Sequence, residues 1–219
     1  MQWPDWNGRV ALPRHRHRPP RSWTQHAPRW RAWTDVAQAD LIAGALARMG
    51  VDRAVVLGHS WGCSVAIALA LNHPDAVSAL VLASGYYYPS PRIDAAVSAA
   101  LLTPLLGVIL RHAVSPPLAR AQWPLVLRKL FGPAPTSTKF EAFPKEMTFR
   151  PSQIRASAAD AALMVPDAAA RARRYRELTL PIVLIAGEVD RVVDIDKQSG
   201  RLHAELSQST LRRVPGAAC

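Results

Sequence analysis

The stretch AVVLGHSWG, residues 54–62, decides the expected fold. Its four leading apolar residues are typical of a buried strand, and the almost continuously apolar segment 61–71 is typical of a buried helix. Between them lies the pattern Gly-x-Ser-x-Gly, centred on Ser60. This order predicts a sharp strand-to-helix turn that holds Ser60 in a backbone conformation unfavourable for non-glycine residues. Ser60 would then be exposed at the carboxyl end of the strand, facing the N–H groups that begin the helix.

The two glycines of the pattern have a steric explanation. Side chains at Gly58 and Gly62 are expected to collide as the strand and the helix close on each other. The alternative interpretation is an ordinary glycine-rich turn in which Ser60 has no chemical role. Cys63, one helical turn after Ser60, is expected to pack in the core rather than to act as a reactive thiol.

Strand and helix signals continue on both sides of this stretch. Thr34 is expected to cap a helix that Gly50 ends, and a short strand follows at residues 79–82. Later segments predict a strand at 181–186, a helix at 196–206 capped by Asp196, and a strand at 210–214. Strands that alternate with helices predict parallel pairing, and therefore an α/β fold. The proline-containing segment between the two α/β parts indicates helices with broken connections.

The composition excludes several classes of protein. The chain has 219 residues, of which 49% are hydrophobic, so it is long enough for one sizeable domain and too apolar for wholesale disorder. Two cysteines are too few for a disulfide scaffold or a cysteine-based zinc cluster. The apolar stretch 95–110 is too short to span a bilayer and predicts buried or interfacial helices. No secretory signal is visible, and a cytoplasmic location is expected.

The net charge of +11 is unevenly distributed. Residues 1–33 contain seven arginines and one acidic residue, with many prolines and no helical or strand periodicity. This segment supports a hypothesis of its own, binding of nucleic acid or another anionic surface. It contains no recognised binding module, so a nucleic-acid partner is not expected. The four-arginine run at positions 171, 173, 174 and 176 is expected to be a solvated helix face.

An acidic residue follows the strand predicted at 181–186. Asp190 lies just beyond the end of that strand, where its carboxylate could orient a histidine and stabilise the imidazolium. Asp194 and Asp196 are close in sequence and compete for this role, although Asp196 fits better as a helix cap. Asp190 is the preferred acid.

Four stretches together resemble the α/β-hydrolase fold superfamily, in its serine-hydrolase branch: AVVLGHSWG, NHPDAVSALVLAS, PIVLIAGEVDRVV and TLRRVPGA. The resemblance implies a partial α/β-hydrolase core with a helical cap inserted in it. It divides the chain into an irregular leader (1–33), a first core part (34–84), the cap (85–177) and a second core part (178–219). The activity implied is hydrolysis of carboxylic esters or related acyl compounds.

The resemblance also implies the residues of the site. Ser60 is the nucleophile, Asp190 the acid of the triad, and the Trp61 N–H one donor of the oxyanion hole. His59 either shapes the pocket beside Ser60 or is simply packed at the turn. The expected partner is a small acyl or ester substrate, with no cofactor and no metal. The aromatic residues of the cap, Tyr86, Tyr87, Tyr88 and Trp123, either line an acyl pocket or close the cap onto the core.

Two departures from the family pattern support a second hypothesis, a catalytically inactive family remnant. The family's histidine follows the last strand, where this chain has Cys219. Residues 1–33 also show neither the family's first strands nor its His-Gly turn, so the chain is expected to be truncated at both ends. His203 and His59 are the first candidates for a substitute base. His203 is otherwise expected to be a surface residue.

Overall fold

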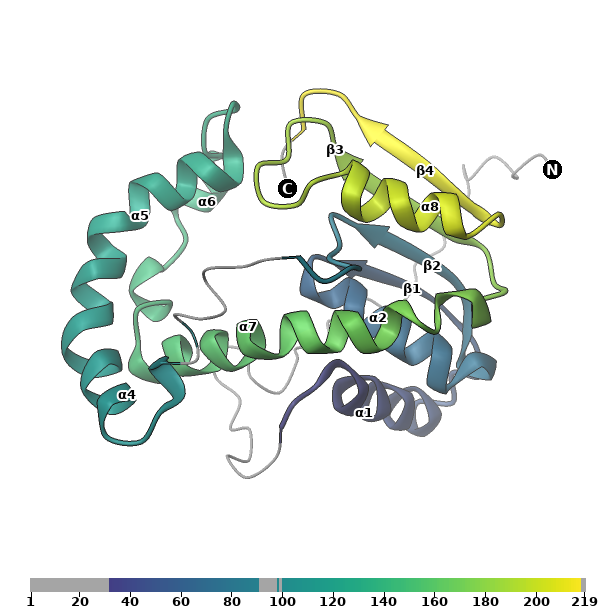
Figure 1. The fold of residues 1–219 in the computed structure, drawn as a ribbon, viewed down its shortest axis with the longest axis horizontal. Helices are drawn as coiled ribbons and strands as arrows, with labels where there is room; N and C mark the ends of the chain where they lie inside the picture. The colour runs from purple at the N-terminus through teal and green to yellow at the C-terminus, as the bar shows by residue number, and fades with distance from the viewer. Residues whose placement is uncertain (1–31, 91–97, 99, 218–219) are drawn as a thin grey trace.

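The computed structural model describes residues 32–90, 98 and 100–217. Its centre is a parallel sheet of four strands, which are neighbours in space in the same order as in the chain (Figure 1). The expectation of parallel pairing is therefore confirmed. The strands are β1 (Ala54–His59), β2 (Val77–Ala83), β3 (Ile182–Gly187) and β4 (Ser209–Val214).

Two helices complete the first α/β unit. Helix α1 (Asp35–Arg48) begins after Thr34, whose hydroxyl accepts a hydrogen bond of 3.1 Å from the Ala37 N–H, as expected for an N-cap. Helix α2 (Trp61–Asn72) connects β1 to β2 through the short turn η1 (Pro74–Ala76). It contacts both strands and α1, and all of its residues from Cys63 to Ala70 are buried. This explains why its sequence is apolar on every side.

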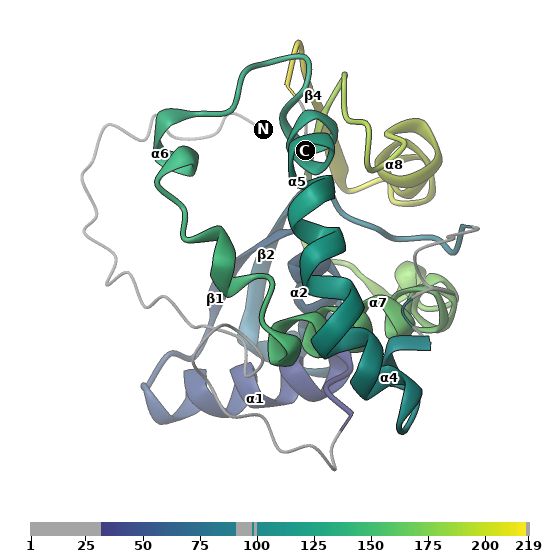
Figure 2. The same cartoon turned by 90° about the vertical axis from the view of Figure 1, so that its left-hand side faces the viewer.

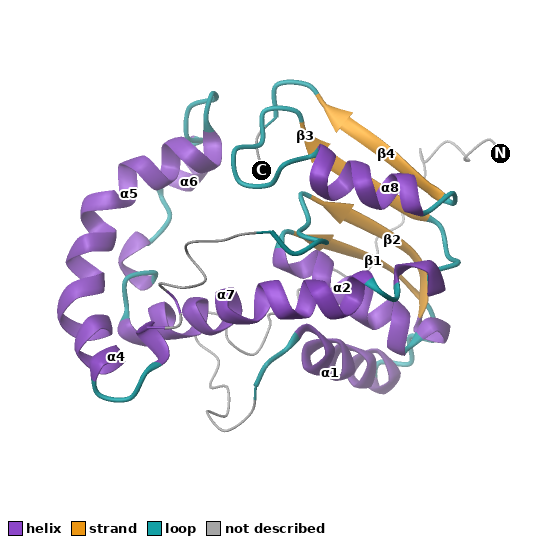
Figure 3. Cartoon of the chain, in the orientation of Figure 1, coloured by secondary structure: helices purple, strands orange, loops and turns teal. Residues whose placement is uncertain are grey.

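The described part of the segment between β2 and β3 is largely helical, as the sequence predicts. We call its helices from α4 to η4 the cap. Helices α5 and α6 lie on the side toward which the arrowheads of the strands point (Figure 3), and α5 is in front when the molecule is viewed from that side (Figure 2). The carboxyl edge of the sheet therefore faces α5 and α6, whereas α7 runs beside α2 (Figure 1). The elements of the cap are α4 (Leu106–Ile109), η2 (Leu110–Val114), α5 (Ser115–Phe131), α6 (Thr138–Glu141), η3 (Lys145–Met147), α7 (Pro151–Ala172) and η4 (Tyr175–Glu177).

The second α/β unit contains the predicted helix in two pieces, η5 (Asp196–Gly200) and α8 (Arg201–Glu205). The prediction that Asp196 caps this helix is wrong. The Asp194 carboxylate instead accepts hydrogen bonds of 3.1 Å from the N–H groups of Asp196 and Lys197. A carboxylate two residues before the start of a helix satisfies N–H groups that have no partner inside the helix.

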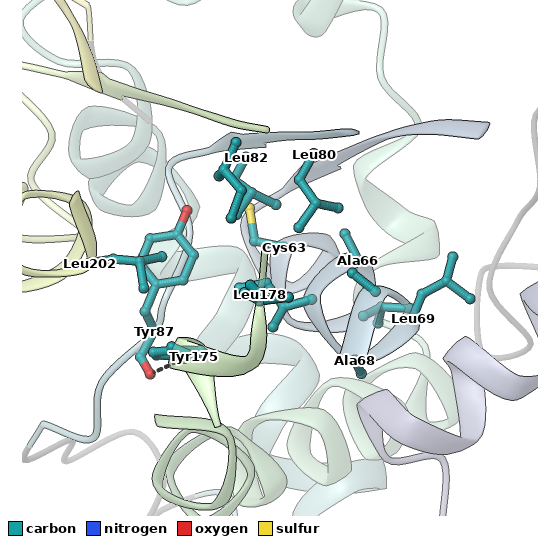
Figure 4. Close-up of a cluster of buried hydrophobic side chains, with 14 of the residues drawn as sticks. Cys63, Ala66, Ala68, Leu69, Leu80, Leu82, Tyr87, Tyr175, Leu178 and Leu202 are labelled. Carbon is teal, nitrogen blue, oxygen red and sulfur yellow. Dashed lines mark hydrogen bonds between the residues drawn. The ribbon is translucent and has the colours of Figure 1, made fainter. Parts of the chain in front are cut away.

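The core joins both units through two buried tyrosines (Figure 4). The Tyr175 hydroxyl donates a hydrogen bond of 2.6 Å to the carbonyl of Tyr87. Gln198 accepts from the N–H groups of Tyr87 and Tyr88 and donates to the Tyr88 carbonyl. Tyr86, Tyr87 and Tyr88 are all buried, which favours the packing interpretation of these aromatic residues over an acyl pocket.

The arginine run of α7 is not uniformly solvated, contrary to expectation. Arg171 is buried and forms an ion pair with the equally buried Asp35 of α1. Arg171 also donates a 3.0 Å hydrogen bond to the Ser64 hydroxyl of α2. Burial lowers the pKa of its guanidinium. The run alone gave no sign of this, because the burial of Arg171 depends on where α7 packs. Arg173 and Arg176 are exposed, as expected.

The two faces of the sheet differ strongly at β1. Val56 and Gly58 lie on the side that α2 covers, whereas Val55 and Leu57 on the opposite side are 65% and 69% exposed. Among the described residues, β1 pairs with β2 alone and so forms an edge of the sheet. An apolar edge of this kind favours aggregation.

Candidate active site

Ser60 occupies the turn between β1 and α2, as the sequence predicts. Its backbone dihedral angles are φ 52° and ψ −119°, in a region that L-residues rarely adopt. The Ser60 N–H donates a 2.9 Å hydrogen bond to the Ala83 carbonyl at the end of β2. The strained serine is therefore tied to the neighbouring strand on one side and begins a buried helix on the other.

Close packing explains Gly58 but not Gly62. A β-carbon at Gly58 would lie 2.6 Å from the Gly62 carbonyl oxygen and 2.8 Å from the Cys63 Cα, both of which belong to the backbone. At Gly62, a β-carbon would meet no atom within 4 Å, so the expected collision there is wrong. Cys63 is fully buried, and its thiol lies 3.3 Å from the carbonyl oxygens of Gly58 and Ala83. Its packing role is as expected.

The start of α2 offers hydrogen-bond donors beside Ser60. Within the part of the chain that the structure describes, the Trp61 N–H forms no hydrogen bond. The first N–H groups of any helix lack partners within the helix and carry a partial positive charge. The arrangement can therefore stabilise negative charge that develops near the Ser60 hydroxyl.

Asp190 and Asp194 differ in how their carboxylates are used. Asp190 is half-buried in the loop after β3, and its Oδ1 accepts hydrogen bonds of 2.7 and 2.9 Å from the N–H groups of Val192 and Val193. Asp194 is exposed, and its Oδ2 pairs with Lys197 at 3.1 Å. The backbone hydrogen bond from Lys197, its ammonium group and the Asp196 N–H lower the pKa of Asp194. Asp194 is thus already used as a helix cap.

The four histidines in the described ranges have different surroundings. Three of them bond to other groups: His73 to Asp40, His112 to the Val108 carbonyl and His203 to the Ser209 hydroxyl. His203 is exposed on α8, as expected. His59 is the last residue of β1 and directly precedes Ser60, and its side chain is exposed.

A family model described as the alpha/beta hydrolase fold matches residues 16–218.

The chain belongs to the α/β-hydrolase fold family.

The family match begins at residue 16 and so includes part of the segment expected to be a leader outside the family. Residues 1–31 and Cys219 lie outside the described residues, so the proposed nucleic-acid-binding leader has no structural description.

Curated relatives match only locally. The protein named "Putative carbamate hydrolase RutD" of Caulobacter sp. strain K31 is 42% identical over 60 residues, which are 27% of this chain and 22% of that protein. The protein of the same name from Cronobacter turicensis is 51% identical over 53 residues, 24% of this chain and 19% of that protein. The matches thus span about a fifth of the length of these relatives.

Solved structures match over most of the chain and show the fold. A thermophilic esterase from Thermogutta terrifontis aligns with a TM-score of 0.62 and 20% identity over 89% of this chain and 67% of the other. A hydrolase from Pseudomonas aeruginosa PA01 aligns with a TM-score of 0.61 and 25% identity over 86% and 66% of the two chains. The epoxide hydrolase CorEH has a TM-score of 0.63 at 18% identity, over 89% and 70%.

The structure also reveals polar residues that the sequence analysis missed. Asp167 of α7 is half-buried, and loss of solvation raises the pKa of its carboxyl to about 6. Its Oδ2 is buried without a hydrogen-bond partner. Arg128 of α5 and Arg191, next to Asp190, line one hollow between the cap and the loop after β3. No sequence signal could have paired these two arginines, because they lie 63 positions apart and meet only through the fold.

Metal-binding clusters and membrane-spanning helices are both absent from the described residues. These residues contain no group of three or more His, Cys, Asp or Glu side chains arranged to hold a metal ion. None of their helices is both long enough and apolar enough to cross a membrane.

Proposed function

We propose that this chain is a serine hydrolase that attacks carboxylic esters or related acyl compounds through Ser60. The observation that carries the proposal is the strained φ of 52° at a serine between a strand and a buried helix. This backbone conformation costs a serine free energy on the order of 1–3 kcal/mol, and residues strained in this way are concentrated at functional sites. Gly58 also supports the proposal, because only glycine permits the close approach of β1 and α2 that creates the turn.

The reaction would proceed by nucleophilic catalysis. The Ser60 hydroxyl attacks the carbonyl carbon and loses its proton to a base, which gives a tetrahedral intermediate with a negatively charged oxygen. The unbonded Trp61 N–H would donate to that oxygen. The intermediate collapses to an acyl-serine and releases the alcohol, and water then hydrolyses the acyl group.

Asp190 is the carboxylate that we assign to orient the base. The two N–H groups that bond to its Oδ1 fix the position of the carboxylate, which leaves Oδ2 available for an imidazole. Because β1 and β3 are parallel, Asp190 and Ser60 both follow strand ends at the carboxyl edge of the sheet. Asp194 is unsuitable for this role, since its two oxygens bond to helical N–H groups and to Lys197.

His59 is the histidine that we place at the pocket beside Ser60. It has no hydrogen bond or ion pair to another described residue, whereas the three other histidines of the described ranges are each engaged elsewhere. Substitution of His59 and of His203 tests each of them as the base. No cofactor is needed for this chemistry.

The expected substrate is a small acyl compound, and the expected site of action is the cytoplasm. A carbamate, which appears in the name of the curated relatives, belongs to the same chemical class, because hydrolysis again begins by attack on a carbonyl carbon. The second candidate function is that of a family member without catalytic activity. It is favoured by the engagement of three of the four described histidines with groups other than the proposed triad.

Hydrolysis of p-nitrophenyl acetate and butyrate decides between the two candidates. The proposal predicts turnover by the wild-type chain that falls at least about a hundredfold in Ser60→Ala and in Asp190→Asn, because triad members act as a unit. Ser207→Ala, at an exposed turn, is the matched control and should keep wild-type turnover. Equal rates for wild type and Ser60→Ala would establish the non-catalytic alternative. Loss of turnover in His59→Gln, with His203→Gln active, would identify His59 as the base.

A further inference from the structure

We propose that Arg128 and Arg191 form a subsite for a carboxylate at the far end of the acyl substrate, so that the preferred substrates are half-esters of dicarboxylic acids. This inference rests on the proposed function, because it names the substrate class of the same site. Arg128 belongs to α5 of the cap, and Arg191 belongs to the loop that follows β3.

The two arginines border one hollow of about 450 Å³. This volume is within the usual range for sites that bind small molecules. The other walls are formed largely by apolar residues, among them Pro124, Leu127 and Pro133. The hydroxyl of Thr136 adds a further polar group. No acidic residue lines the hollow, so nothing in its wall neutralises the two guanidinium groups.

Neither guanidinium has an acidic partner elsewhere in the described part of the chain. Two other exposed arginines of the same regions do have acidic partners. Arg120 of α5 pairs with Glu146 at 2.7 Å, and Arg213 of β4 pairs with Asp196 at 2.5 Å. Two unpaired guanidinium groups at one apolar hollow favour binding of an anion that is itself attached to an apolar chain.

Arg191 lies close to the cap. A β-carbon at Gly132 would come within 3.0 Å of its Nη1 atom and 3.4 Å of its Cζ atom, so the guanidinium lies directly against the Gly132 backbone. The Gly132 N–H in turn donates a 3.1 Å hydrogen bond to the Arg128 carbonyl. This proximity places the end of α5 beside the loop after β3, where both arginines border the same hollow.

One residue of the hollow, Arg191, belongs to the loop at the edge of the sheet where Ser60 is found. Arg191 directly follows Asp190, and β3 is separated from β1 by the single strand β2. Parallel strands are spaced about 4.8 Å apart, so the ends of β1 and β3 are roughly 10 Å from each other. An acyl chain with a carboxylate at one end and an ester carbonyl at the other could span from the arginines to Ser60.

The chemistry of the hollow favours a carboxylate over a phosphate. Arginine binds a planar carboxylate through two parallel N–H donors, and the apolar wall suits the methylene chain of a dicarboxylic acid. Inorganic phosphate shares the charge but not the chain. It therefore serves as the probe that separates recognition of this substrate class from general attraction of anions.

Calorimetric titration of the whole chain carrying Ser60→Ala, which should not hydrolyse the probes, tests the subsite without requiring turnover. The probes are the monomethyl and dimethyl esters of succinate, adipate and sebacate, together with inorganic phosphate. We expect at least one monomethyl ester to bind about tenfold more tightly than its dimethyl ester, a difference typical of a charge-assisted hydrogen bond. Arg128→Gln and Arg191→Gln should each weaken that binding about tenfold. Arg173→Gln, an exposed arginine at the end of α7, should leave it unchanged.

Several results would overturn the subsite: equal affinity for mono- and dimethyl esters, no binding of any monomethyl ester, or unchanged affinity in both arginine variants. Tighter binding of phosphate than of every monomethyl ester would show a general anion site instead. Arg191→Lys keeps the charge and loses the paired donors, so it should bind at a level between wild type and Arg191→Gln.

The binding result and the hydrolysis result are independent. If Ser60→Ala still binds the monomethyl ester and the arginine variants do not, the subsite stands even when no turnover is found. If turnover depends on Ser60 but shows no preference for half-esters, the proposed hydrolase stands and the subsite is wrong.

Discussion

Helices α2 and α5 show how differently the core and the cap are held. In α2, all residues from Cys63 to Ala70 are buried. In α5, Pro116 is the only buried residue, whereas Leu118 and Leu125 are 51% and 63% exposed. The strained turn at Ser60 is therefore followed by a closely packed helix, whereas α5 of the cap makes few packed contacts. In the proposed hydrolase, the packed core would hold Ser60 in its turn, and α5 would contribute to ligand recognition through Arg128.

The largest effect is expected at the junction of the two regions. Arg171→Leu leaves the Asp35 carboxylate buried without its partner, which should lower the free energy of unfolding by about 3–5 kcal/mol. Arg173→Leu, two residues away and exposed, should change it by less than about 0.5 kcal/mol. Urea unfolding measures both variants.

The double variant Asp35→Leu/Arg171→Leu sharpens this test. It removes both charges and should recover most of the stability lost by Arg171→Leu, because a buried ion pair replaced by apolar residues is often neutral. A loss in Arg171→Leu no larger than in Arg173→Leu would show that α7 is not held to the core by this pair.

Substitution of one leucine in each helix compares the packing of α2 directly with that of α5. Leu69 in α2 is fully buried, so Leu69→Ala should cost about 3 kcal/mol through lost burial and the cavity that remains. Leu125→Ala in α5 should cost less than about 0.5 kcal/mol, because this side chain is largely exposed. Similar losses from the two substitutions, measured by urea unfolding, would contradict the contrast between core and cap.

Alanine substitutions at the two glycines near Ser60 test whether close packing is the reason for glycine at the turn. Gly58→Ala should lower the free energy of unfolding by about 2–3 kcal/mol, because its β-carbon would meet backbone atoms that cannot move independently. Gly62→Ala should leave stability unchanged or raise it by up to about 1 kcal/mol, since the position is open and alanine favours helix formation. Chemical unfolding of the two variants side by side distinguishes them, and equal destabilisation would refute the steric account.

The smallest effect concerns the pH dependence of stability. The pKa of Asp167 is raised to about 6 in the folded chain by burial and is near 3.9 in an unfolded one, so the folded state binds this proton more tightly. The contribution of Asp167 to the free energy of unfolding is therefore fully present below about pH 4 and is lost as the pH rises through about 6. The full shift corresponds to about 3 kcal/mol, which partial exposure to solvent reduces to about 1 kcal/mol. Asp167→Asn should remove this part of the decline in thermal stability between pH 4 and 7, and an unchanged pH profile would contradict it.

The sequence predicted those parts of the fold that depend on local pattern. The apolar strand, the Gly-x-Ser-x-Gly turn and the apolar helix after it are contiguous, so Ser60 and its strained turn followed from nine residues. The sequence did not show that a side chain would fit at Gly62, because the direction of a β-carbon there depends on the relative placement of β1 and α2.

Features that depend on contacts between residues far apart in the sequence could not be predicted. Arg171 resembled its solvated neighbours in sequence, and only the docking of α7 against α1 buries it. The meeting of Arg128 and Arg191 likewise depends on the contact between the end of α5 and the loop after β3. For the acid of the triad, sequence position alone left Asp190, Asp194 and Asp196 in competition. The hydrogen bonds of the first two now support Asp190 as our assignment.

Covalent labelling with a fluorophosphonate tests most directly whether Ser60 is a nucleophile, because the reagent phosphonylates an activated serine and releases fluoride. The chain and its Ser60→Ala variant are treated alike, digested and analysed by mass spectrometry. Our account predicts one adduct on the peptide that contains Ser60, no adduct in Ser60→Ala, and slower labelling of Asp190→Asn. No adduct on the wild-type chain, or an adduct on another serine that persists in Ser60→Ala, would contradict it.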